Sequence, residues 1–215
     1  MTIRIGIDFD NTIAGYDNVF LRVAKEIKLI PSDFEGSKKS IRDAIRKLDD
    51  GENKWQCLQG RVYGRNMKDA HMIDGVADFL SYCRNLNDVD IYIVSHKTEY
   101  GHYDPMKINL RDAAMSWMES NKFFKKETGG FGIDRERVFF EFTRNEKLER
   151  IRILGCCYFI DDLEEVLNDI RFPQNTRRIL FTNGATDNIK NISYDICQSW
   201  HEIKSIIFAH GREST

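Results

Sequence analysis

The stretch Ile3-Arg4-Ile5-Gly6-Ile7-Asp8-Phe9-Asp10-Asn11-Thr12 decides the fold class of this 215-residue chain. Its first half alternates isoleucines with other residues and ends at an aspartate, a pattern that is typical of a buried β-strand. The second half is polar and begins where the strand ends. In open parallel α/β sheets, ligands bind beyond the carboxyl ends of the strands. The stretch therefore predicts a core strand followed directly by candidate functional residues.

Four later segments resemble the first strand in composition. Residues 90–94, 138–142, 156–160 and 178–181 are short, apolar and rich in β-branched or aromatic side chains. Between them, apolar residues recur with the spacing of amphipathic helices. Strands that alternate with helices predict an α/β fold, in which a Rossmann-like parallel sheet of about five strands is flanked by helices on both faces.

One interval interrupts this alternation. From about Ile13 to Ile73 the sequence contains no convincing strand, and two runs of apolar residues there have helical spacing. An insertion of this length after the first strand predicts a small helical cap over residues 14–73, joined to a core formed by residues 1–13 and 74–215. The alternative is an early βα excursion of the main domain, which the length of the interval disfavours.

Composition and charge narrow the possible partners and locations. Lys and Arg number 32 and Asp and Glu 34, so the net charge of -2 favours neither a large nucleic-acid interface nor an anionic membrane surface. The five cysteines are odd in number and form no CxxC pair, which favours reduced thiols in a cytoplasmic protein. We expect neither a signal peptide nor a membrane span. The sequence indicates no oligomeric state.

Asp8 and Asp10 are the first candidates for chemistry because they follow the first predicted strand. Two carboxylates this close together repel each other and disfavour joint ionisation. A hard divalent cation such as Mg²⁺ relieves the repulsion, since carboxylate oxygens are the ligands it prefers. The alternative is that both acids are solvated, or that Asp10 caps a turn or a helix.

Two polar residues follow later predicted strands. Ser95 comes directly after residues 91–94, where its hydroxyl group and the next backbone amides could hold a phosphate oxygen. Lys147 lies in the first turn of a predicted helix, where a cation opposes the helix dipole, so a local anion would account for it. The alternative for Ser95 is an ordinary polar residue at a strand end. The alternative for Lys147 is an exposed surface lysine, in which case Arg144 or Arg150 could take the role of Lys147.

Asp161 and Asp162 follow the predicted strand at 156–160. A pair of acids directly after a buried strand is unfavourable unless a positive group receives it. The alternative is that one of them caps the next helix, although a single aspartate would suffice for that. Each of these signals is weak alone. Because all of them are found near the ends of predicted strands and in this order, together they favour one common site.

In this order the motifs resemble those of the haloacid dehalogenase (HAD) superfamily. Its pattern is a DxDxT strand, a Ser or Thr after a second strand, a later Lys, and an acidic pair after another strand. The matching residues are Asp8-Phe9-Asp10-Asn11-Thr12, Val94-Ser95, Lys147 and Phe159-Ile160-Asp161-Asp162. The resemblance extends from Ile3 to about Leu167, and the helical interval after the first strand looks like the C1-type cap of that superfamily.

The resemblance implies a magnesium-dependent phosphatase. Asp8 would attack phosphorus and form an aspartyl-phosphate, while Asp10 would protonate the leaving oxygen and then activate water. Mg²⁺ would be held by Asp8, the backbone carbonyl of Asp10, Asp161 and Asp162, and would screen the anionic nucleophile from the anionic substrate.

The resemblance also assigns the groups that hold the phosphoryl oxygens. Ser95 and Lys147 would neutralise them, and we place Asn11 with these two as a phosphate-binding candidate. A cap that closes over the site favours small substrates over polymers. We therefore expect a small phosphorylated metabolite, such as a sugar or polyol phosphate or a nucleotide, and not a nucleic acid.

Specificity in capped members of the superfamily lies in the cap and in the loop after the second motif. The main candidates are Arg61, Arg65, His96 and Lys97, with Tyr63, His71 and Tyr100 beside them. His96 and Lys97 could contact a second anionic or polyhydroxyl part of the substrate. The alternative for each of these residues is ordinary surface polarity.

Three other functions stay open at this point. A phosphomutase or phosphotransferase would pass the phosphoryl group to a second hydroxyl group in place of water. A receiver-like phosphate sensor also combines Asp, Ser or Thr and Lys, but its phosphoacceptor follows a middle strand. A non-catalytic scaffold on the same fold is disfavoured because Asp8 and Asp10 are both present.

Overall fold

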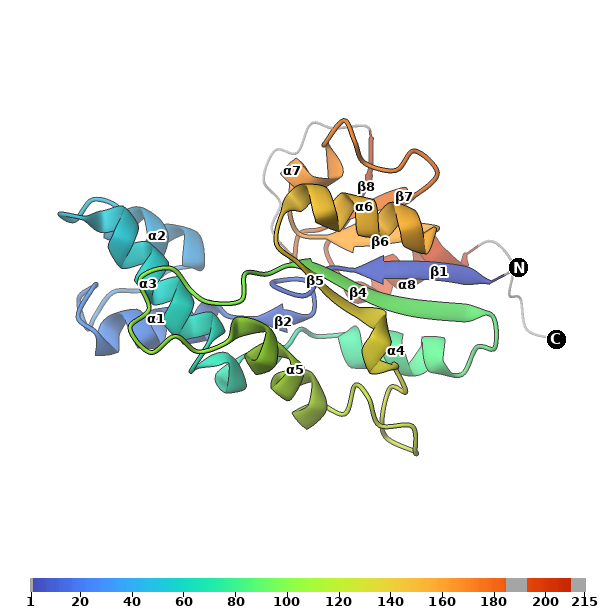
Figure 1. The fold of residues 1–215 in the computed structure, drawn as a ribbon, viewed down its shortest axis with the longest axis horizontal. Coiled ribbons are helices and arrows are strands. Elements are labelled where there is room, and N and C mark those ends of the chain that lie inside the picture. The colour runs from blue at the N-terminus through green and yellow to red at the C-terminus, as the bar shows by residue number, and fades with distance from the viewer. Residues whose placement is uncertain (1, 185–192, 210–215) are drawn as a thin grey trace. The chain divides into compact units, whose positions relative to one another are not determined.

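The computed structural model describes residues 2–184 and 193–209 (Figure 1). Contacts divide the chain into two compact units. Unit 1 contains the described residues within 1–14, 72–96 and 122–215, and unit 2 contains Gly15–His71 and Lys97–Asn121. Unit 2 thus includes nearly all of the interval predicted as a cap and, in addition, the segment after Ser95. The functional division into catalytic core and cap stays a prediction.

Unit 1 is built on a six-stranded sheet in the order β5-β4-β1-β6-β7-β8, in which neighbouring strands run parallel. The strands are β1 (Ile3–Ile7), β4 (Val89–His96), β5 (Val138–Glu141), β6 (Tyr158–Asp161), β7 (Arg177–Phe181) and β8 (Asp195–Cys197). All five segments predicted as strands belong to this sheet, which confirms the α/β class. The additional strand β8 has only three residues, too few to produce a recognisable pattern in the sequence.

Helices cover both faces of this sheet. They are α4 (Val76–Arg84), α6 (Arg144–Leu154), α7 (Glu164–Leu167) and α8 (Trp200–Phe208), with the 3-10 helix η2 (Arg135–Arg137) before β5. Leu180 of β7 belongs to the apolar cluster under α6 and α7. The next residue, Phe181, points to the opposite face and contacts Trp200 of α8, with ring centroids 5.9 Å apart. Both faces of the sheet are therefore packed, as the near-continuous apolar strands predict.

Local signals in the sequence determine the two ends of α6 and the close packing against β1. Thr143 and Glu146 form a capping box at the start of α6, and Gly155 ends the helix in the left-handed conformation with φ 62°. Within β1, a Cβ atom on Gly6 would lie 2.5 Å from the ring of Phe159. Glycine at this position lets the aromatic ring approach the strand closely.

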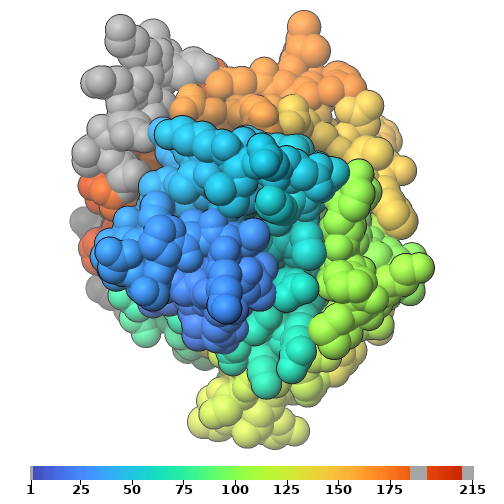
Figure 2. Space-filling model, turned by 90° about the vertical axis from the view of Figure 1, so that its left-hand side faces the viewer, coloured from blue at the N-terminus to red at the C-terminus, as the bar shows by residue number. Residues whose placement is uncertain are grey.

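Unit 2 is helical. It contains α1 (Asp17–Glu26), α2 (Lys38–Ile45), α3 (Gly51–Tyr63), the 3-10 helix η1 (Met67–Asp69) and α5 (Leu110–Ser120). Phe20 and Trp55 stack with ring centroids 5.2 Å apart, and Trp117 donates a hydrogen bond to the carbonyl oxygen of Ala70 at 2.9 Å. Figure 2 shows a face of this unit on which residues 15–71 lie beside the segment 97–121.

A pair of short strands was not expected from the sequence. β2 (Ala14–Gly15) and β3 (His71–Met72) form a two-stranded sheet within the interval for which no strand is predicted. Two residues per strand are too few to produce a periodic pattern, so the expectation was wrong there. At these strands the chain passes from unit 1 into unit 2 and back. Over the described residues, no helix combines the length and the apolar character needed to cross a bilayer.

Candidate active site

The strand order brings three of the predicted site residues to one edge of the sheet. Ile7 at the end of β1 pairs with Ile93 of β4 on one side and with Ile160 of β6 on the other. Asp8 follows directly, and its backbone N–H donates to the carbonyl oxygen of Ile160 at 2.9 Å. Ser95 lies two residues beyond Ile93, and Asp161 one residue beyond Ile160. These side chains therefore converge because their strands are neighbours.

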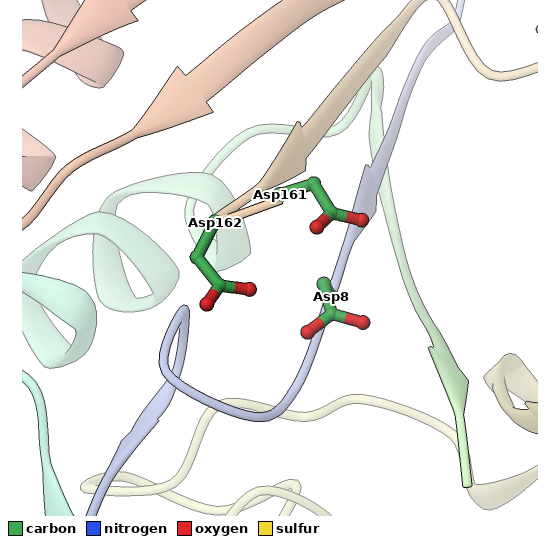
Figure 3. A group of neighbouring side chains, drawn as sticks. All are labelled: Asp8, Asp161 and Asp162. Carbon is green, nitrogen blue, oxygen red and sulfur yellow. The ribbon is translucent and has the colours of Figure 1, made fainter. Parts of the chain in front are cut away.

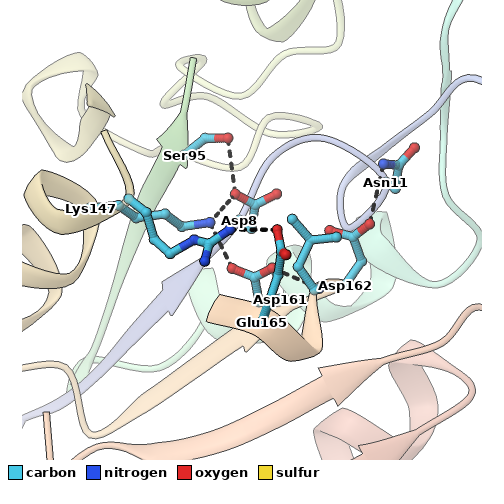
Figure 4. A network of polar contacts seen from close by, with 9 residues as sticks. Asp8, Asn11, Ser95, Lys147, Asp161, Asp162 and Glu165 are labelled. Atoms are coloured by element: carbon cyan, nitrogen blue, oxygen red, sulfur yellow. Dashed lines mark hydrogen bonds and ion pairs between the residues drawn. The ribbon is translucent and has the colours of Figure 1, made fainter. Parts of the chain in front are cut away.

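Lys147 is the residue that joins these strand ends. Its Nζ lies 2.5 Å from Oδ1 of Asp8 and 2.6 Å from Oδ2 of Asp161. The side chain is only 2% exposed, so it is not the surface lysine of the alternative interpretation. Ser95 donates from its hydroxyl group to the same Oδ1 of Asp8 at 3.0 Å. Figure 4 shows Lys147 reaching between the two carboxylates from α6, with Ser95 beside Asp8.

Burial at this site changes the protonation of its charged groups. Burial raises the pKa of Asp8 to about 7, helped by the negative charges of Asp161 and Asp10 and opposed by the charge of Lys147. Burial works to lower the pKa of Lys147, but the adjacent charges of Asp161 and Asp8 outweigh it, so this pKa lies above its ordinary value. Lys147 therefore stays charged, while Asp8 takes up a proton near neutral pH.

Three carboxylates face one another at the same edge of the sheet. Asp8, Asp161 and Asp162 each offer an oxygen within 4.8 Å of the others. Figure 3 shows the three side chains grouped where the chain leaves β1 and β6. Asp8 and Asp161 are buried, and Asp162 is half-buried. An all-oxygen donor set with several negative charges fits Mg²⁺, which takes carboxylate and water oxygens. These residues thus satisfy the chemical requirement for the cofactor expected from the sequence.

The turn after Asp8 positions two further predicted residues. Asn11 has a left-handed backbone with φ 59°, and its Nδ2 donates to Oδ2 of Asp162 at 3.2 Å. The side chain of Asn11 thus orients the carboxylate of Asp162. That Asn11 binds the phosphate group of the substrate stays a prediction. Asp10 is half-buried, and its carboxylate is not one of the three that face one another. The expectation that Asp10 offers its backbone carbonyl to the metal is compatible with this placement.

The basic neighbours of Lys147 have other partners. Arg144 pairs with Glu165 of α7 at 2.6 Å, and Arg150 pairs with Glu141 of β5 at 2.7 Å. The alternative that one of these arginines takes the role of Lys147 therefore finds no support. Glu165 was missed in the sequence because an exposed glutamate in the first turn of a helix is ordinary.

The four specificity candidates have different surroundings. Arg61 is half-buried in α3, and Arg65 is exposed. His96 is exposed, and its Nε2 donates to the carbonyl oxygen of Phe142 at 2.8 Å. Lys97 is only 4% exposed, and its Nζ lies 4.9 Å from the ring centroid of Tyr63. Ordinary surface polarity therefore does not describe Lys97, whereas it still fits Arg65.

Comparison with known proteins identifies the fold. No protein-family model matches this sequence, and no curated protein sequence matches it either. Among solved structures, a haloacid dehalogenase-like hydrolase from Streptococcus pneumoniae shares 12% sequence identity, covers 96% of this chain and 98% of its own, and superposes with a TM-score of 0.63.

Two further structures agree with the first. The HAD hydrolase YfnB from Bacillus subtilis, which is bound to magnesium, shares 16% identity, with 96% and 99% of the two chains covered and a TM-score of 0.61. A HAD family hydrolase from Deinococcus radiodurans, with bound phosphate and sodium, shares 10% identity, with 96% and 95% covered and a TM-score of 0.58. The chain described here therefore has the haloacid dehalogenase-like fold.

Proposed function

We propose that this protein is a magnesium-dependent phosphatase that hydrolyses a small phosphomonoester through an aspartyl-phosphate on Asp8. The observation that carries the proposal is the bridge formed by Lys147 between Asp8 and Asp161, at the edge where three carboxylates meet. A buried lysine between two acids at the carboxyl end of a parallel sheet is costly to build for stability alone. It is well suited to a centre that receives both a cation and an anionic group.

Asp8 is the proposed nucleophile. Ser95 and Lys147 both donate to its Oδ1, and neither of these two bonds reaches Oδ2. When an anionic phosphoryl group arrives, Ser95 and Lys147 exchange a bond to Asp8 for a bond to a phosphoryl oxygen. This exchange stabilises the charge of the transferring group and frees the Asp8 carboxylate to attack phosphorus.

Asp10 is the proposed acid and base. It lies two residues beyond the nucleophile, after the strand has ended, so the turn aims its side chain independently of Asp8. In the first step Asp10 gives its proton to the leaving oxygen, and in the second step it takes a proton from the water that attacks the phosphoenzyme. Substrates whose leaving oxygen needs no proton would depend less on Asp10.

Asp8, Asp161 and Asp162 are the proposed ligands of Mg²⁺, with the backbone carbonyl of Asp10 beside them. The metal supplies positive charge that screens the nucleophile from the phosphoryl group. Asn11 holds Asp162 in place through its hydrogen bond. The magnesium and the phosphate recorded in the structures of the Bacillus subtilis and Deinococcus radiodurans hydrolases support this assignment.

Unit 2 is the proposed cap, and it would restrict the substrate to a small phosphorylated metabolite. A helical unit inserted after β1 and again after β4 suits this role, because closure of such a unit excludes water and large substrates from a site. Sugar phosphates, polyol phosphates and nucleotides are therefore preferred to polymers.

A panel assay tests this proposal. The purified protein with Mg²⁺ should release phosphate from at least one small phosphomonoester, and a chelator should stop the release. Asp8→Asn keeps the shape of the side chain and should abolish turnover, whereas the matched surface variant Asp33→Asn should behave as the wild type. An Asp8→Asn variant with an undiminished rate would rule out the nucleophile that we propose.

A further inference from the structure

We propose that Trp200 of α8 is a positioning residue for the metal site, which it supports through the turn that follows Asp8. We refer to this turn, residues 9–14, as the catalytic turn. The inference rests on the Mg²⁺ site proposed above and adds a residue from the last helix of the chain. Trp200 lies 188 positions from Thr12, the residue of the catalytic turn that it contacts. Both residues belong to unit 1.

A hydrogen bond from Trp200 anchors the catalytic turn. The indole Nε1 donates to the carbonyl oxygen of Thr12 at 3.2 Å. Thr12 is fully buried, and its own hydroxyl group has no hydrogen-bond partner within the described residues. The side chain of Thr12 therefore does not anchor the turn. The indole group supplies the donor that a buried carbonyl group requires.

Packing from several sides fixes the ring of Trp200. The residue is 1% exposed, and its ring centroid lies 4.9 Å from that of Phe79 in α4 and 5.9 Å from that of Phe181 in β7. A Cβ atom on Gly75, which has φ 86°, would lie 2.8 Å from the Cβ atom of Trp200. Glycine at this position lets the start of α4 approach Trp200 closely. The indole N–H is thus a preorganised donor.

The catalytic turn connects this anchor to a proposed metal ligand. Asn11 directly precedes Thr12 and has a left-handed backbone with φ 59°. Its backbone N–H donates to the carbonyl oxygen of Ala14 at 2.8 Å, and its side chain donates to Asp162 at 3.2 Å. A left-handed conformation is uncommon for a residue other than glycine, so we expect surrounding contacts to hold it. The bond from Trp200 supplies such a contact at the next residue.

This support matters because a metal site depends on the orientation of its ligands. Asp162 is half-buried, whereas Asp8 and Asp161 are buried, so Asp162 is the least confined of the three proposed ligands. Figure 4 shows the bond by which Asn11 orients it. Loss of a residue that orients a metal ligand typically weakens metal binding by about 10–100-fold. Trp200 acts one step further from the metal, so we expect a smaller effect.

A second buried tryptophan provides a matched control. Trp117 is 3% exposed, and its indole group also donates to a backbone carbonyl oxygen, that of Ala70, at 2.9 Å. Both of these residues lie in unit 2, outside the catalytic turn. Substitution by phenylalanine removes the same kind of hydrogen bond at either tryptophan and keeps an aromatic ring. A difference in metal binding between Trp200→Phe and Trp117→Phe therefore reports on the catalytic turn and not on stability in general.

Calorimetric titration of the full-length protein with Mg²⁺ tests the inference. We expect Trp200→Phe to raise the dissociation constant for Mg²⁺ about three- to tenfold, whereas Trp117→Phe should bind Mg²⁺ as the wild type does. Asn11→Ala should raise the constant at least as much as Trp200→Phe, because it removes the donor to Asp162. When both substitutions are combined, Trp200→Phe should add little to the effect of Asn11→Ala, since both act through the same ligand.

A measurement on the unsubstituted protein covers the case in which Trp200→Phe folds poorly. The chain has three tryptophans, whose ¹⁵N-labelled indole N–H resonances can be assigned with Trp55→Phe and Trp117→Phe. Because coupling between two sites is reciprocal, Mg²⁺ must strengthen a hydrogen bond that supports its own binding. Added Mg²⁺ should therefore slow solvent exchange of the Trp200 indole N–H by the same factor, about three- to tenfold, and leave that of Trp117 unchanged.

The possible outcomes separate this inference from the proposed function. If the wild type binds Mg²⁺ and Trp200→Phe binds it equally well, or if Trp117→Phe weakens binding as much, the positioning role is overturned and the metal site stands. Additive losses in the combined variant, or exchange at the Trp200 indole that Mg²⁺ leaves unchanged, would overturn the positioning role too. A wild-type protein that binds no Mg²⁺ would overturn both this inference and the proposed metal-dependent function.

Discussion

Each unit of this protein buries a lysine, but the surroundings of the two lysines differ. In unit 1, Lys147 lies between two carboxylates, so one positive charge meets two negative ones. In unit 2, Lys97 lies over the ring of Tyr63, which attracts an ammonium group but has no net charge. The first arrangement is a buried ion pair network at the edge of the sheet, whereas the second holds a buried ammonium group against an aromatic ring.

Replacing each of the two lysines by methionine tests this comparison. Of the substitutions proposed here, Lys147→Met should have the largest effect on the free energy of unfolding. Lys147→Met leaves Asp8 and Asp161 buried without their cation, which should lower the free energy of unfolding by about 3–5 kcal/mol at neutral pH. Lys97→Met keeps most of the contact with the Tyr63 ring and should cost about 0.5–2 kcal/mol. Urea denaturation of both variants in the presence of a chelator measures the two losses. Equal losses would show that the two lysines do not differ as described.

Mg²⁺ should restore part of the stability that the protein loses in Lys147→Met. The metal supplies positive charge to the same carboxylates, so it should stabilise Lys147→Met more than it stabilises the wild type. For Lys97→Met the stabilisation by Mg²⁺ should equal that of the wild type. Thermal denaturation with and without Mg²⁺ distinguishes these cases, and an equal shift for all three proteins would contradict a metal site at Asp8 and Asp161.

The pH dependence of Mg²⁺ binding should reflect the raised pKa of Asp8. The metal binds the ionised carboxylate, so below the pKa of about 7 a proton must first leave Asp8. Affinity should therefore fall roughly tenfold for each pH unit below this value and level off above it. Calorimetric titrations from two units below this value to one unit above it measure the slope. A constant affinity over this range would show that Asp8 is already ionised in the metal-free protein.

A smaller effect is expected from Tyr63→Phe. The substitution removes the hydroxyl group that accepts from Lys38 and keeps the ring under both ammonium groups. We expect a loss of about 1 kcal/mol or less in the free energy of unfolding, measured by urea denaturation beside the control Lys39→Met. A loss as large as that of Lys147→Met would mean that the hydrogen bond between Lys38 and the Tyr63 hydroxyl group contributes as much as the buried ion pairs of Lys147.

Except for the short strand β8, the strands of the unit 1 sheet and the edge that carries the candidate site could be predicted from the sequence. The core strands are rich in apolar residues, because a parallel sheet is buried on both faces. Lys147 was recognisable because a cation in the first turn of a helix is unfavourable. Its 2.5 Å contact with Asp8 was not, because the two residues lie 139 positions apart and only the sheet order brings them together.

The sequence said less about unit 2 for equally physical reasons. The stretch from Trp55 to Met72 mixes aromatic and polar residues without a clear period, yet most of it forms α3 and η1, because tertiary packing overrides weak local signals. Lys38 was missed as a partner of Tyr63, to whose hydroxyl group it donates a hydrogen bond. No motif led to it, and its aromatic partner Tyr63 lies on a different helix.

The proposed mechanism requires Asp8 to become covalently phosphorylated during turnover. The most direct test is rapid acid quenching during turnover of a phosphomonoester identified in the substrate panel, followed by peptide mass spectrometry. We expect one phosphoryl group on the peptide that contains Asp8, and none on the same peptide of Asp8→Asn. Phosphate release by the wild type without any phosphorylated Asp8 peptide, together with continued turnover by Asp8→Asn, would contradict this mechanism.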